Sequence, residues 1–244
     1  MVESTPTTLA EGDYRERRPT PYLAARVACV WGSRHSGPVR IKPIVPDGCI
    51  DLIWSSHDGR VHVAGPDTGP FPAQLRPAEE FAGVRLRPGA AAAVLGVPAS
   101  ALRDARVWLG DLWTGEAARF ADTVAAAVDR PRALESLIAQ RVLDAGPRDR
   151  AIVGVVKALA TGVGVHDLAA QLGYSERHLL RRCREEFGYG PKILHRVLRF
   201  QRALRAIDSG MPLAEVAHRC GYSDQAHLTR EVRNLGGAPP SARV

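Results

Sequence analysis

Two stretches in the last third of the chain share one pattern: LAAQLGYSERHLLRRCREEFG at residues 168–188 and VAHRCGYSDQAHLTREVRNLGG at residues 216–237. The tripeptide Gly-Tyr-Ser recurs at an offset of 48 residues, and after one inserted residue the apolar positions match at an offset of 49. Each copy is typical of a short helix, a turn that contains glycine and a longer helix that follows a serine. This is the layout of a helix-turn-helix, whose second helix enters the DNA major groove. The repeat therefore predicts two such units.

A long helix is predicted between the two copies, at residues 191–207, because its apolar positions follow the spacing of one helix face. These positions are Ile193, Val197, Phe200, Leu204 and Ile207. Four arginines of this helix are expected to form a solvated face, with Arg199 the first candidate for an exception: Arg196, Arg199, Arg202 and Arg205. Other helices are predicted at residues 149–160, 167–172, 176–187, 212–220 and 224–235. The second half is thus expected to be an all-α domain of two helix-turn-helix units joined by a long helix.

The positive charge of the chain lies in the same half. The chain has 33 Lys plus Arg against 26 Asp plus Glu, a formal net charge of +7. Residues 1–145 contain 17 basic and 17 acidic side chains, so the whole excess falls on residues 146–244. A basic module joined to a neutral one indicates a polyanion partner for the basic module alone.

The first half is typical of strands followed by helices. Runs rich in Val and Ile, separated by turn residues, predict strands at residues 26–31, 40–45, 50–54, 60–64 and 83–86. Helices are predicted at residues 116–128 and 132–143, and the Ala-rich residues 89–95 are a candidate for a third. The expected fold class is an α+β domain, a small antiparallel barrel or sandwich plus helices, with a cupin-like barrel as one form of it.

The expected organisation has three parts. A mobile tail occupies residues 1–20, a sensor or dimerisation domain residues 21–146, and a DNA-binding domain residues 147–244. Gly146 and Pro147 mark the linker between the two domains, because both residues break regular structure.

Four motifs span about residues 149–241: DLAAQLGYSERHLLRR, REEFGYGP, RVLRFQRAL and PLAEVAHRCGYSDQAHLTREV. Together they resemble the DNA-binding domain of the AraC/XylS family of bacterial transcription regulators. The resemblance implies that the two units read adjacent major-groove segments on one face of DNA. More loosely, PDGCIDLIW, VAGPDTGPF and GVRLRPGAAAAVLGVP resemble a domain of unassigned function that precedes this domain in many bacterial regulators.

Helical geometry sorts each second helix into a core face and an exposed face. The expected core residues are Leu179, Cys183 and Phe187 in the first copy and Leu228, Val232 and Leu235 in the second. The resemblance implies base contacts at six other positions: Arg177, Leu180, Arg181, Gln225, Ala226 and Arg230. Arginine suits guanine, glutamine suits adenine, and Ala or Leu can touch a thymine methyl group. Phosphate contacts, which position the domain without reading sequence, are expected at Ser175, Arg184, Thr229 and Arg233.

The first half is expected to bind a small effector or a second copy of the chain. It holds all four tryptophans, Trp31, Trp54, Trp108 and Trp113, which suit either an aromatic pocket or core packing. The alternative is a cupin-like metal-binding enzyme or a stress or redox sensor whose helices only tether it to nucleic acid. Its candidate ligands are Asp47, Asp51, His57, His62 and Asp67, although turn aspartates and surface histidines explain them as well. Common hydrolase, phosphate-loop and zinc-protease motifs are missing from the sequence, so no enzyme activity, metal or cofactor is expected.

The remaining features concern the compartment and the partners. The four cysteines, Cys29, Cys49, Cys183 and Cys220, form no C-x-x-C pair, and a redox pair of Cys29 with Cys49 is a minor alternative.

The sequence has no apolar stretch of membrane-spanning length and no secretory signal at its N-terminus, so a cytoplasmic, nucleoid-associated protein is expected. The expected partners are operator or promoter DNA, a small-molecule effector, a second copy in a homodimer and, for an activator, RNA polymerase.

Overall fold

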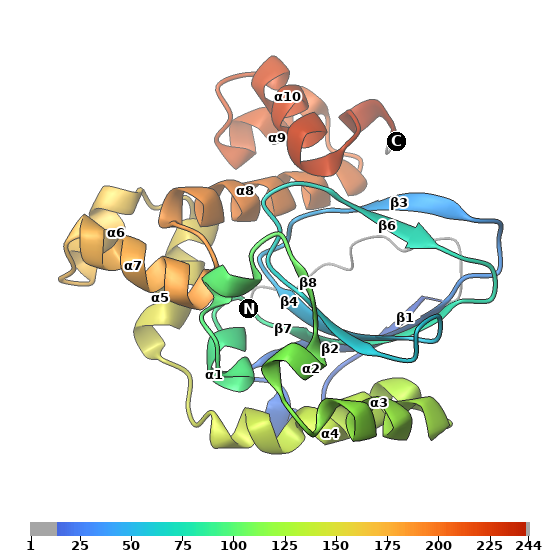
Figure 1. The fold of residues 1–244 in the computed structure, drawn as a ribbon. Helices are drawn as coiled ribbons and strands as arrows, with labels where there is room; N and C mark the ends of the chain where they lie inside the picture. Colours follow the sequence, from blue (N-terminus) through green and yellow to red (C-terminus); the bar gives the residue numbers. More distant parts are fainter. Residues whose placement is uncertain (1–13, 243–244) are drawn as a thin grey trace.

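A six-stranded antiparallel sheet forms the centre of the first half in the computed structural model, which describes residues 14–242 (Figure 1). The sheet has the order β1-β2-β7-β4-β5-β8: β1 (Arg15–Arg17), β2 (Val27–Arg34), β7 (Glu80–Leu86), β4 (Ile50–Ser55), β5 (Val61–Ala64) and β8 (Arg106–Trp108). A separate two-stranded ribbon pairs β3 (Arg40–Ile44) with β6 (Phe71–Leu75).

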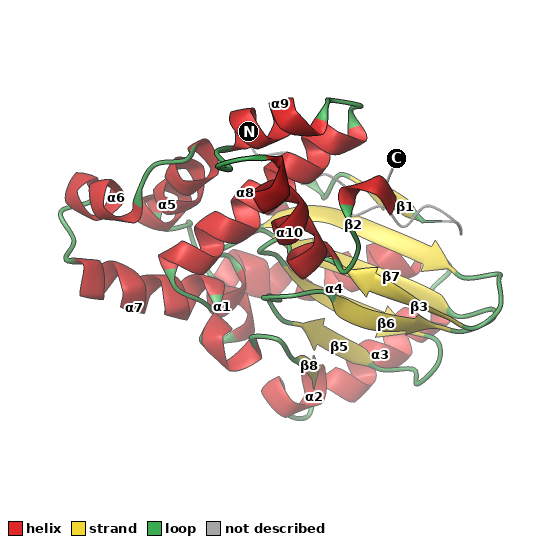
Figure 2. Ribbon diagram, turned by 90° about the horizontal axis from the view of Figure 1, so that it is seen from above, coloured by secondary structure: helices red, strands yellow, loops and turns green. Residues whose placement is uncertain are grey.

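The two faces of the six-stranded sheet are covered differently. The helices α3 (Ala117–Ala126) and α4 (Arg130–Asp144) lie against one face, and the β3–β6 ribbon lies over the other (Figures 1 and 2). Strand β4 shows how the sequence encodes this, because successive side chains of a strand point to opposite faces. Ile50, Leu52 and Trp54 are buried in the core under the helices, whereas Asp51 and Ile53 face the ribbon.

Short helical segments complete the first half: η1 (Pro21–Leu23), α1 (Ala91–Leu95), η2 (Ala99–Leu102) and α2 (Leu109–Leu112). The predicted fold class is confirmed, and all five predicted strands, the two predicted helices and the third candidate helix are present. Strands β1, β6 and β8 were not predicted. Two of them have only three residues, and β6 contains Pro72 opposite Pro43, where each proline removes a ladder donor and weakens the strand pattern.

The predicted mobile tail is wrong from residue 14 onward, while residues 1–13 lie outside the described part of the chain. Arg15, Glu16 and Arg17 form β1 and pair with β2. Arg17 also forms a salt bridge of 2.8 Å with the buried carboxylate of Glu135 on α4. A partner this far along the chain holds the segment in place, and no local pattern in the sequence reveals it.

The second half is helical. Its elements are α5 (Arg150–Thr161), α6 (Val165–Gln171), α7 (Glu176–Phe187), α8 (Pro191–Asp208), α9 (Leu213–Cys220), α10 (Gln225–Gly236) and η3 (Pro240–Ala242). The predicted pair of helix-turn-helix units is therefore present as α6–α7 and α9–α10, with α8 between them (Figures 1 and 2). Among residues 14–242, no helix is long and apolar enough to cross a membrane.

Helix α8 belongs to two separate cores. Its first part contributes Leu194 and Val197 to a core with α5, α6 and α7, and its second part contributes Phe200 and Leu204 to a core with α9 and α10. The core of the first half ends with Val142 of α4, and the next core begins with Ile152 of α5. The chain thus passes between cores near the predicted linker, and the exact domain bounds stay a prediction.

Candidate nucleic-acid interface and ligand cavity

Helix α7 is fixed at both ends and along one face. The Ser175 hydroxyl accepts a hydrogen bond from the His178 backbone N at 3.2 Å, which caps the N-terminus. Leu179, Cys183 and Phe187 are buried, as predicted. Gly188 ends the helix with a φ of +84°, a conformation that glycine adopts without strain. The opposite face is left for contacts with another molecule.

Helix α10 repeats this construction. The Asp224 carboxylate accepts a hydrogen bond from the His227 backbone N at 2.6 Å, and this bond lowers the pKa of Asp224. The predicted core residues Leu228, Val232 and Leu235 are buried. A T-shaped contact between Tyr222 and His227 stands where the first unit has Tyr174 against His178. The two units therefore match in caps, cores and ring contacts.

The structure leaves most of the predicted base-contact residues exposed. On α7 these are Arg177 and Arg181, and on α10 they are Gln225, Ala226 and Arg230. Arg181 forms a surface ion pair with Glu185 at 3.1 Å. Leu180 differs, because it is half-buried against the backbone of Gly190 and offers only part of its side chain.

The predicted phosphate contacts fall into two kinds. Arg184 and Arg233 are exposed in the last turns of α7 and α10. The hydroxyl groups are already engaged: Ser175 caps α7, and Thr229 donates to the Gln225 carbonyl at 2.9 Å. Ser175 keeps its own proton for a phosphate oxygen, whereas Thr229 must first release Gln225. All of these contacts stay predictions.

The arginines of α8 hold the two units together, so the prediction of a solvated face is wrong for Arg196 and Arg202, while Arg199 is an exception as expected. Arg196 donates two hydrogen bonds to Glu231 of α10, at 2.6 and 2.9 Å, and Arg199 stands 3.6 Å from the same carboxylate. Arg202 donates to the carbonyls of Ala160 on α5 and Cys220 on α9, at 2.6 and 2.9 Å. These guanidinium groups bind the carbonyl ends of helices and a buried acid, where a basic group is stabilising.

A cavity of about 360 Å³ lies in the first half between the sheet and the β3–β6 ribbon. Its apolar wall includes Ile44, Ile53, Phe71, Leu75 and Phe81. Its polar lining comes from both sheets and their loops: Ser33, Asp47, Asp51, Ser55, His62, Asp67, Gln74, Arg85 and Arg106. The volume lies within the usual range for small-molecule sites.

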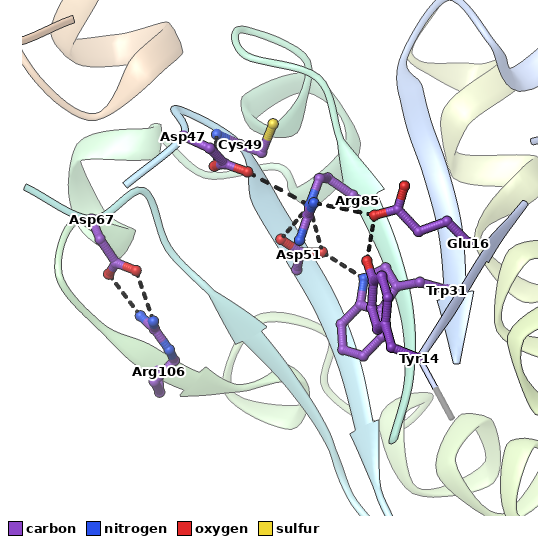
Figure 3. A network of polar contacts seen from close by, with 9 residues as sticks. All are labelled: Tyr14, Glu16, Trp31, Asp47, Cys49, Asp51, Asp67, Arg85 and Arg106. Carbon is purple, nitrogen blue, oxygen red and sulfur yellow. Dashed lines mark hydrogen bonds and ion pairs between the residues drawn. The ribbon is translucent and has the colours of Figure 1, made fainter. Parts of the chain in front are cut away.

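Arg85 is the most buried charge of this cavity, with a side chain only 8% exposed (Figure 3). Its Nε lies 3.2 Å from Asp51 and 3.7 Å from Asp47, and its Nη1 lies 3.7 Å from Glu16. Burial alone lowers the pKa of Arg85, but the charges of Asp51 and Asp47 outweigh it and the pKa is raised. Burial raises the pKa of Asp51 in spite of Arg85. The guanidinium of Arg85 thus lies within ion-pair distance of three carboxylates.

The neighbours of Arg85 are held by the sheet. Trp31 donates its indole N–H to Asp51 at 2.8 Å, and its ring covers Gly83 on the neighbouring strand. A Cβ at Gly83 would come within 2.0 Å of that ring, so only glycine fits there. At the other end of the cavity, Arg106 forms two hydrogen bonds of 2.8 Å with Asp67. Figure 3 shows the Arg106–Asp67 pair apart from the group around Arg85.

Sequence patterns missed Arg85 and Arg106, although they suggested Asp47, Asp51 and Asp67. The signal for Arg85 was present, because Val84 and Leu86 are core residues and the residue between them must point to the other face of the strand. The signal for Arg106 was absent, because its partner lies 39 residues away.

The metal and redox alternatives gain no support from the side chains. His62 bonds to Asp58 at 2.6 Å, and no group of three or more His, Cys, Asp or Glu in residues 14–242 is arranged to hold a metal ion. Cys29 and Cys49 are free and buried, and burial raises the pKa of the Cys29 thiol to about 12. A thiol in that state is a poor nucleophile at neutral pH.

The cavity lining touches both helix-turn-helix units. The Pro46 carbonyl accepts a buried hydrogen bond of 2.6 Å from Gln201 of α8, and Val45 packs into the core of the second unit. In the β5–β6 loop, Pro66 packs on Gly188 and Pro70 on Gly237. These glycines end α7 and α10 and are equivalent in the repeat, at an offset of 49.

Two family models match the chain. A helix-turn-helix domain matches residues 168–243, and a domain of unknown function (DUF6597) matches residues 15–108. The first model covers both repeated units, and the second covers the sheet, the ribbon and the cavity.

Two curated relatives match part of the chain. The chain is 30% identical over 69 residues to YbfI of Bacillus subtilis (strain 168), an uncharacterized HTH-type transcriptional regulator, covering 28% of this chain and 25% of that protein. It is 33% identical over 100 residues to AlkA of Mycobacterium tuberculosis, a probable bifunctional transcriptional activator/DNA repair enzyme, covering 39% and 20%. That match lies at the helix-turn-helix region. The chain thus spans a quarter or less of these relatives.

Among solved structures, ToxT from Vibrio cholerae O395 is 9% identical, with a TM-score of 0.45 over 88% of this chain and 96% of that one. A probable AraC family transcriptional regulator from Rhodopseudomonas palustris CGA009 is 24% identical, with a TM-score of 0.35 over 39% and 94%. The domain matches confirm the resemblance seen in the sequence motifs. The chain joins an N-terminal DUF6597 domain to a C-terminal helix-turn-helix domain of the AraC type.

Proposed function

We propose that this protein is a sequence-specific DNA-binding transcription regulator that reads two adjacent major-groove segments with α7 and α10. The observation that carries the proposal is the matched construction of two helix-turn-helix units on the basic half of the chain. In each unit the apolar side of the second helix is buried and an arginine-bearing side is exposed. An exposed basic helix of this kind fits the major groove in shape and in charge.

The roles of the side chains follow from their positions. Arg177, Leu180 and Arg181 of α7 and Gln225, Ala226 and Arg230 of α10 contact bases. Ser175, Arg184, Thr229 and Arg233 contact phosphates. In the described part of the chain, Arg177, Arg184, Arg230 and Arg233 form no ion pair that DNA would have to break. Base contacts select the sequence, and phosphate contacts set the position on the duplex.

The DUF6597 domain controls these units in the proposed mechanism. A small effector occupies the cavity and changes the β5–β6 loop, whose two prolines rest on the ends of α7 and α10. Asp67 and Phe71 of the same segment line the cavity, so one loop contacts the effector and both reading helices. The effector then shifts the population of DNA-competent arrangements by binding one of them more tightly. The proposal includes no catalytic step and no resident metal.

The further partners are those of a bacterial regulator acting on the nucleoid in the cytoplasm. They are a second copy of the chain and, for an activator, RNA polymerase. Neither is needed for the first test, which concerns DNA alone.

Selection of DNA from a random-sequence pool by the full chain tests the proposal directly. The expected result is a motif of two short blocks about one helical turn apart, roughly 10 base pairs, because each unit reads one groove segment. Binding should weaken steeply with salt as phosphate contacts release counterions. Recovery of no motif, with binding that depends only on salt, would contradict the proposal.

Gly188 and Gly237, the glycines that end α7 and α10, offer a matched pair of variants that test the contact between the β5–β6 loop and the two reading helices. Gly188→Ala and Gly237→Ala both place alanine at a positive φ, +84° and +78°, which costs about 1 kcal/mol of stability in each case. At Gly237 the new Cβ makes ordinary contacts of 3.6 and 3.7 Å with Pro70 and Pro43. At Gly188 it lies 2.5 Å from Pro66 and 3.0 Å from the Ala99 carbonyl, so the first unit must move away, at about 1 kcal/mol more.

Exchange of backbone amide hydrogens, followed by mass spectrometry, measures how the two variants differ in local stability. Gly188→Ala should raise exchange in η2 and at the end of α7, whereas Gly237→Ala should leave η2 as in the wild type. Equal exchange in η2 for the two variants would show that the packing of Pro66 and Ala99 on Gly188 does not restrain α7.

A further inference from the structure

We infer that the cavity of the DUF6597 domain binds a small organic cation, an ammonium or guanidinium-type group on a compact apolar or aromatic body. The inference names the class of effector that the proposed sensor domain binds. Its link to DNA binding rests on the proposed function. It depends on the shape of the cavity, on the balance of its charges and on the hydrogen bonds that its charged groups lack.

The cavity has a polar end and apolar walls. Asp47, Asp51 and Arg85 form the polar end, and Phe71, Phe81 and Ile53 contribute to the walls. Volumes of this size, about 360 Å³, suit a compact molecule that places one polar group and buries an apolar remainder. One face of the Phe71 ring already holds the Arg106 guanidinium, whose carbon lies 3.7 Å from the ring centroid. Aromatic rings attract cations in this way, and Phe81 is the second ring of the wall.

The charges at the polar end do not balance. Among residues 14–242, Arg85 is the cation paired with two carboxylates of the lining, Asp51 and Asp47, and it also lies 3.7 Å from Glu16, which is outside the lining. At the other end Arg106 and Asp67 neutralise each other through two short hydrogen bonds. The described residues thus leave an excess of negative charge beside Arg85. Uncompensated charge in a buried place is costly, and a bound cation removes the cost.

The hydrogen bonds at this end are incomplete as well. Asp51 already accepts hydrogen bonds from Arg85 Nε, at 3.2 and 3.3 Å, and from the Trp31 indole N–H at 2.8 Å. Asp47 Oδ1 accepts from the Cys49 backbone N at 2.8 Å, whereas the contact of Asp47 Oδ2 with Arg85 Nε is a longer one of 3.7 Å. A ligand N–H group placed between Asp47 and Asp51 would supply the missing donor. The positions of these groups are visible in Figure 3.

Two other ligand classes fit less well. A carboxylate ligand would add a fourth negative group around Arg85, and the charge of Arg106 is already neutralised by Asp67. A metal ion would need three or more suitable side chains, and the described residues offer no such group. An organic cation is the remaining class that corrects the charge and uses the apolar walls.

Calorimetric titration of the full chain without DNA tests the ligand class. The probes are benzylamine, benzyl alcohol and benzoate, which share one body and differ in charge, together with butylamine and butyrate. The amines are expected to bind, and benzylamine at least roughly tenfold more tightly than benzyl alcohol or benzoate, because a charged hydrogen bond is worth more than a neutral one.

Asp47→Asn is the matching variant. Asparagine keeps the acceptor for the Cys49 N–H and removes the negative charge, so the loop should hold its shape while benzylamine binds at least roughly tenfold more weakly. Asp58→Asn is the control, because this carboxylate is exposed, pairs with His62 and is not part of the cavity lining. It should leave the titration unchanged.

Each other outcome overturns the inference. Benzoate or butyrate binding more tightly than the amines would make this an anion site. Equal affinity of Asp47→Asn and the wild type would place the amine elsewhere, and no binding by any of the five probes would exclude a small-cation site of this size. The titration contains no DNA, so a negative titration does not contradict the proposed DNA binding. A failed DNA selection likewise does not contradict the proposed ligand class.

Discussion

Replacing Arg181 and Arg230 together by alanine is expected to abolish selective DNA binding. The two residues are exposed and occupy equivalent positions of the repeat, one on each reading helix. A good bidentate contact to a base is worth about 1–3 kcal/mol, so loss of two contacts in separate grooves should cost about 2–6 kcal/mol. That is a loss of roughly thirtyfold at the least in affinity for the selected motif.

The same change should hardly affect folding. Arg181 loses a surface ion pair with Glu185, which is worth less than about 1 kcal/mol, and an exposed contact of 3.4 Å with His178, and Arg230 forms no ion pair within residues 14–242. A binding assay with the selected motif and a mutated motif, together with urea unfolding of the variant, therefore distinguishes a loss of base contacts from a loss of folding stability.

Arg119→Ala is the matched control. Arg119 is exposed on α3 of the DUF6597 domain, so its removal lowers the net charge by one without touching either reading helix. It should reduce affinity for both motifs slightly and equally. If the double variant also weakened both motifs equally, Arg181 and Arg230 would be phosphate contacts and the proposed base readout would be wrong.

The sequence alone predicted the features that depend on local patterns. Leu179, Cys183 and Phe187 follow a helical period, and α7 buries all three. The repeat itself revealed the second unit, because the same period and the same Gly-Tyr-Ser turn occur twice. In the first half, runs of Val and Ile between turn residues gave the strands whose inner faces build the core.

The features that the sequence could not predict depend on contacts between distant segments. Arg17 is fixed by Glu135, and Arg106 by Asp67, and neither partner is marked by any local spacing. The α8 arginines have the spacing of an exposed face, yet Arg202 is bound by carbonyl groups at the ends of two other helices. Charge patterns show where arginines lie on a helix, but tertiary packing decides whether they meet water, DNA or another helix.

Glu231→Ala is expected to destabilise the chain by about 3 kcal/mol. The Glu231 side chain is 9% exposed and accepts both hydrogen bonds from Arg196, so it ties α10 to α8. Its removal leaves Arg196 and Arg199 without their shared partner. The expected loss of about 3 kcal/mol is at the lower end of the range for breaking a buried ion pair, because the Arg196 side chain is 40% exposed and can be hydrated once Glu231 is removed.

Urea unfolding monitored by helical circular dichroism checks the size of this effect. The matched control is Glu215→Ala on α9, which removes an exposed carboxylate that pairs with Arg219 at 2.7 Å. That variant should cost less than about 1 kcal/mol, as surface ion pairs do. Equal losses for the two variants would mean that the contact between α8 and α10 adds nothing beyond a surface pair.

The pH dependence of this contact has a definite sign. Burial alone raises the pKa of Glu231, but the hydrogen bonds from Arg196 and the charges of Arg196 and Arg199 outweigh it and lower the pKa. A lowered pKa in the folded state means that the stabilisation is complete above the unfolded value of about 4.3 and is lost as pH falls through the folded value. The difference in unfolding free energy between the wild type and Glu231→Gln should therefore be constant near neutral pH and shrink below about pH 4. A difference that grew in acid would show that the folded pKa of Glu231 lies above its unfolded value, and that the ion pair with Arg196 does not stabilise the folded chain.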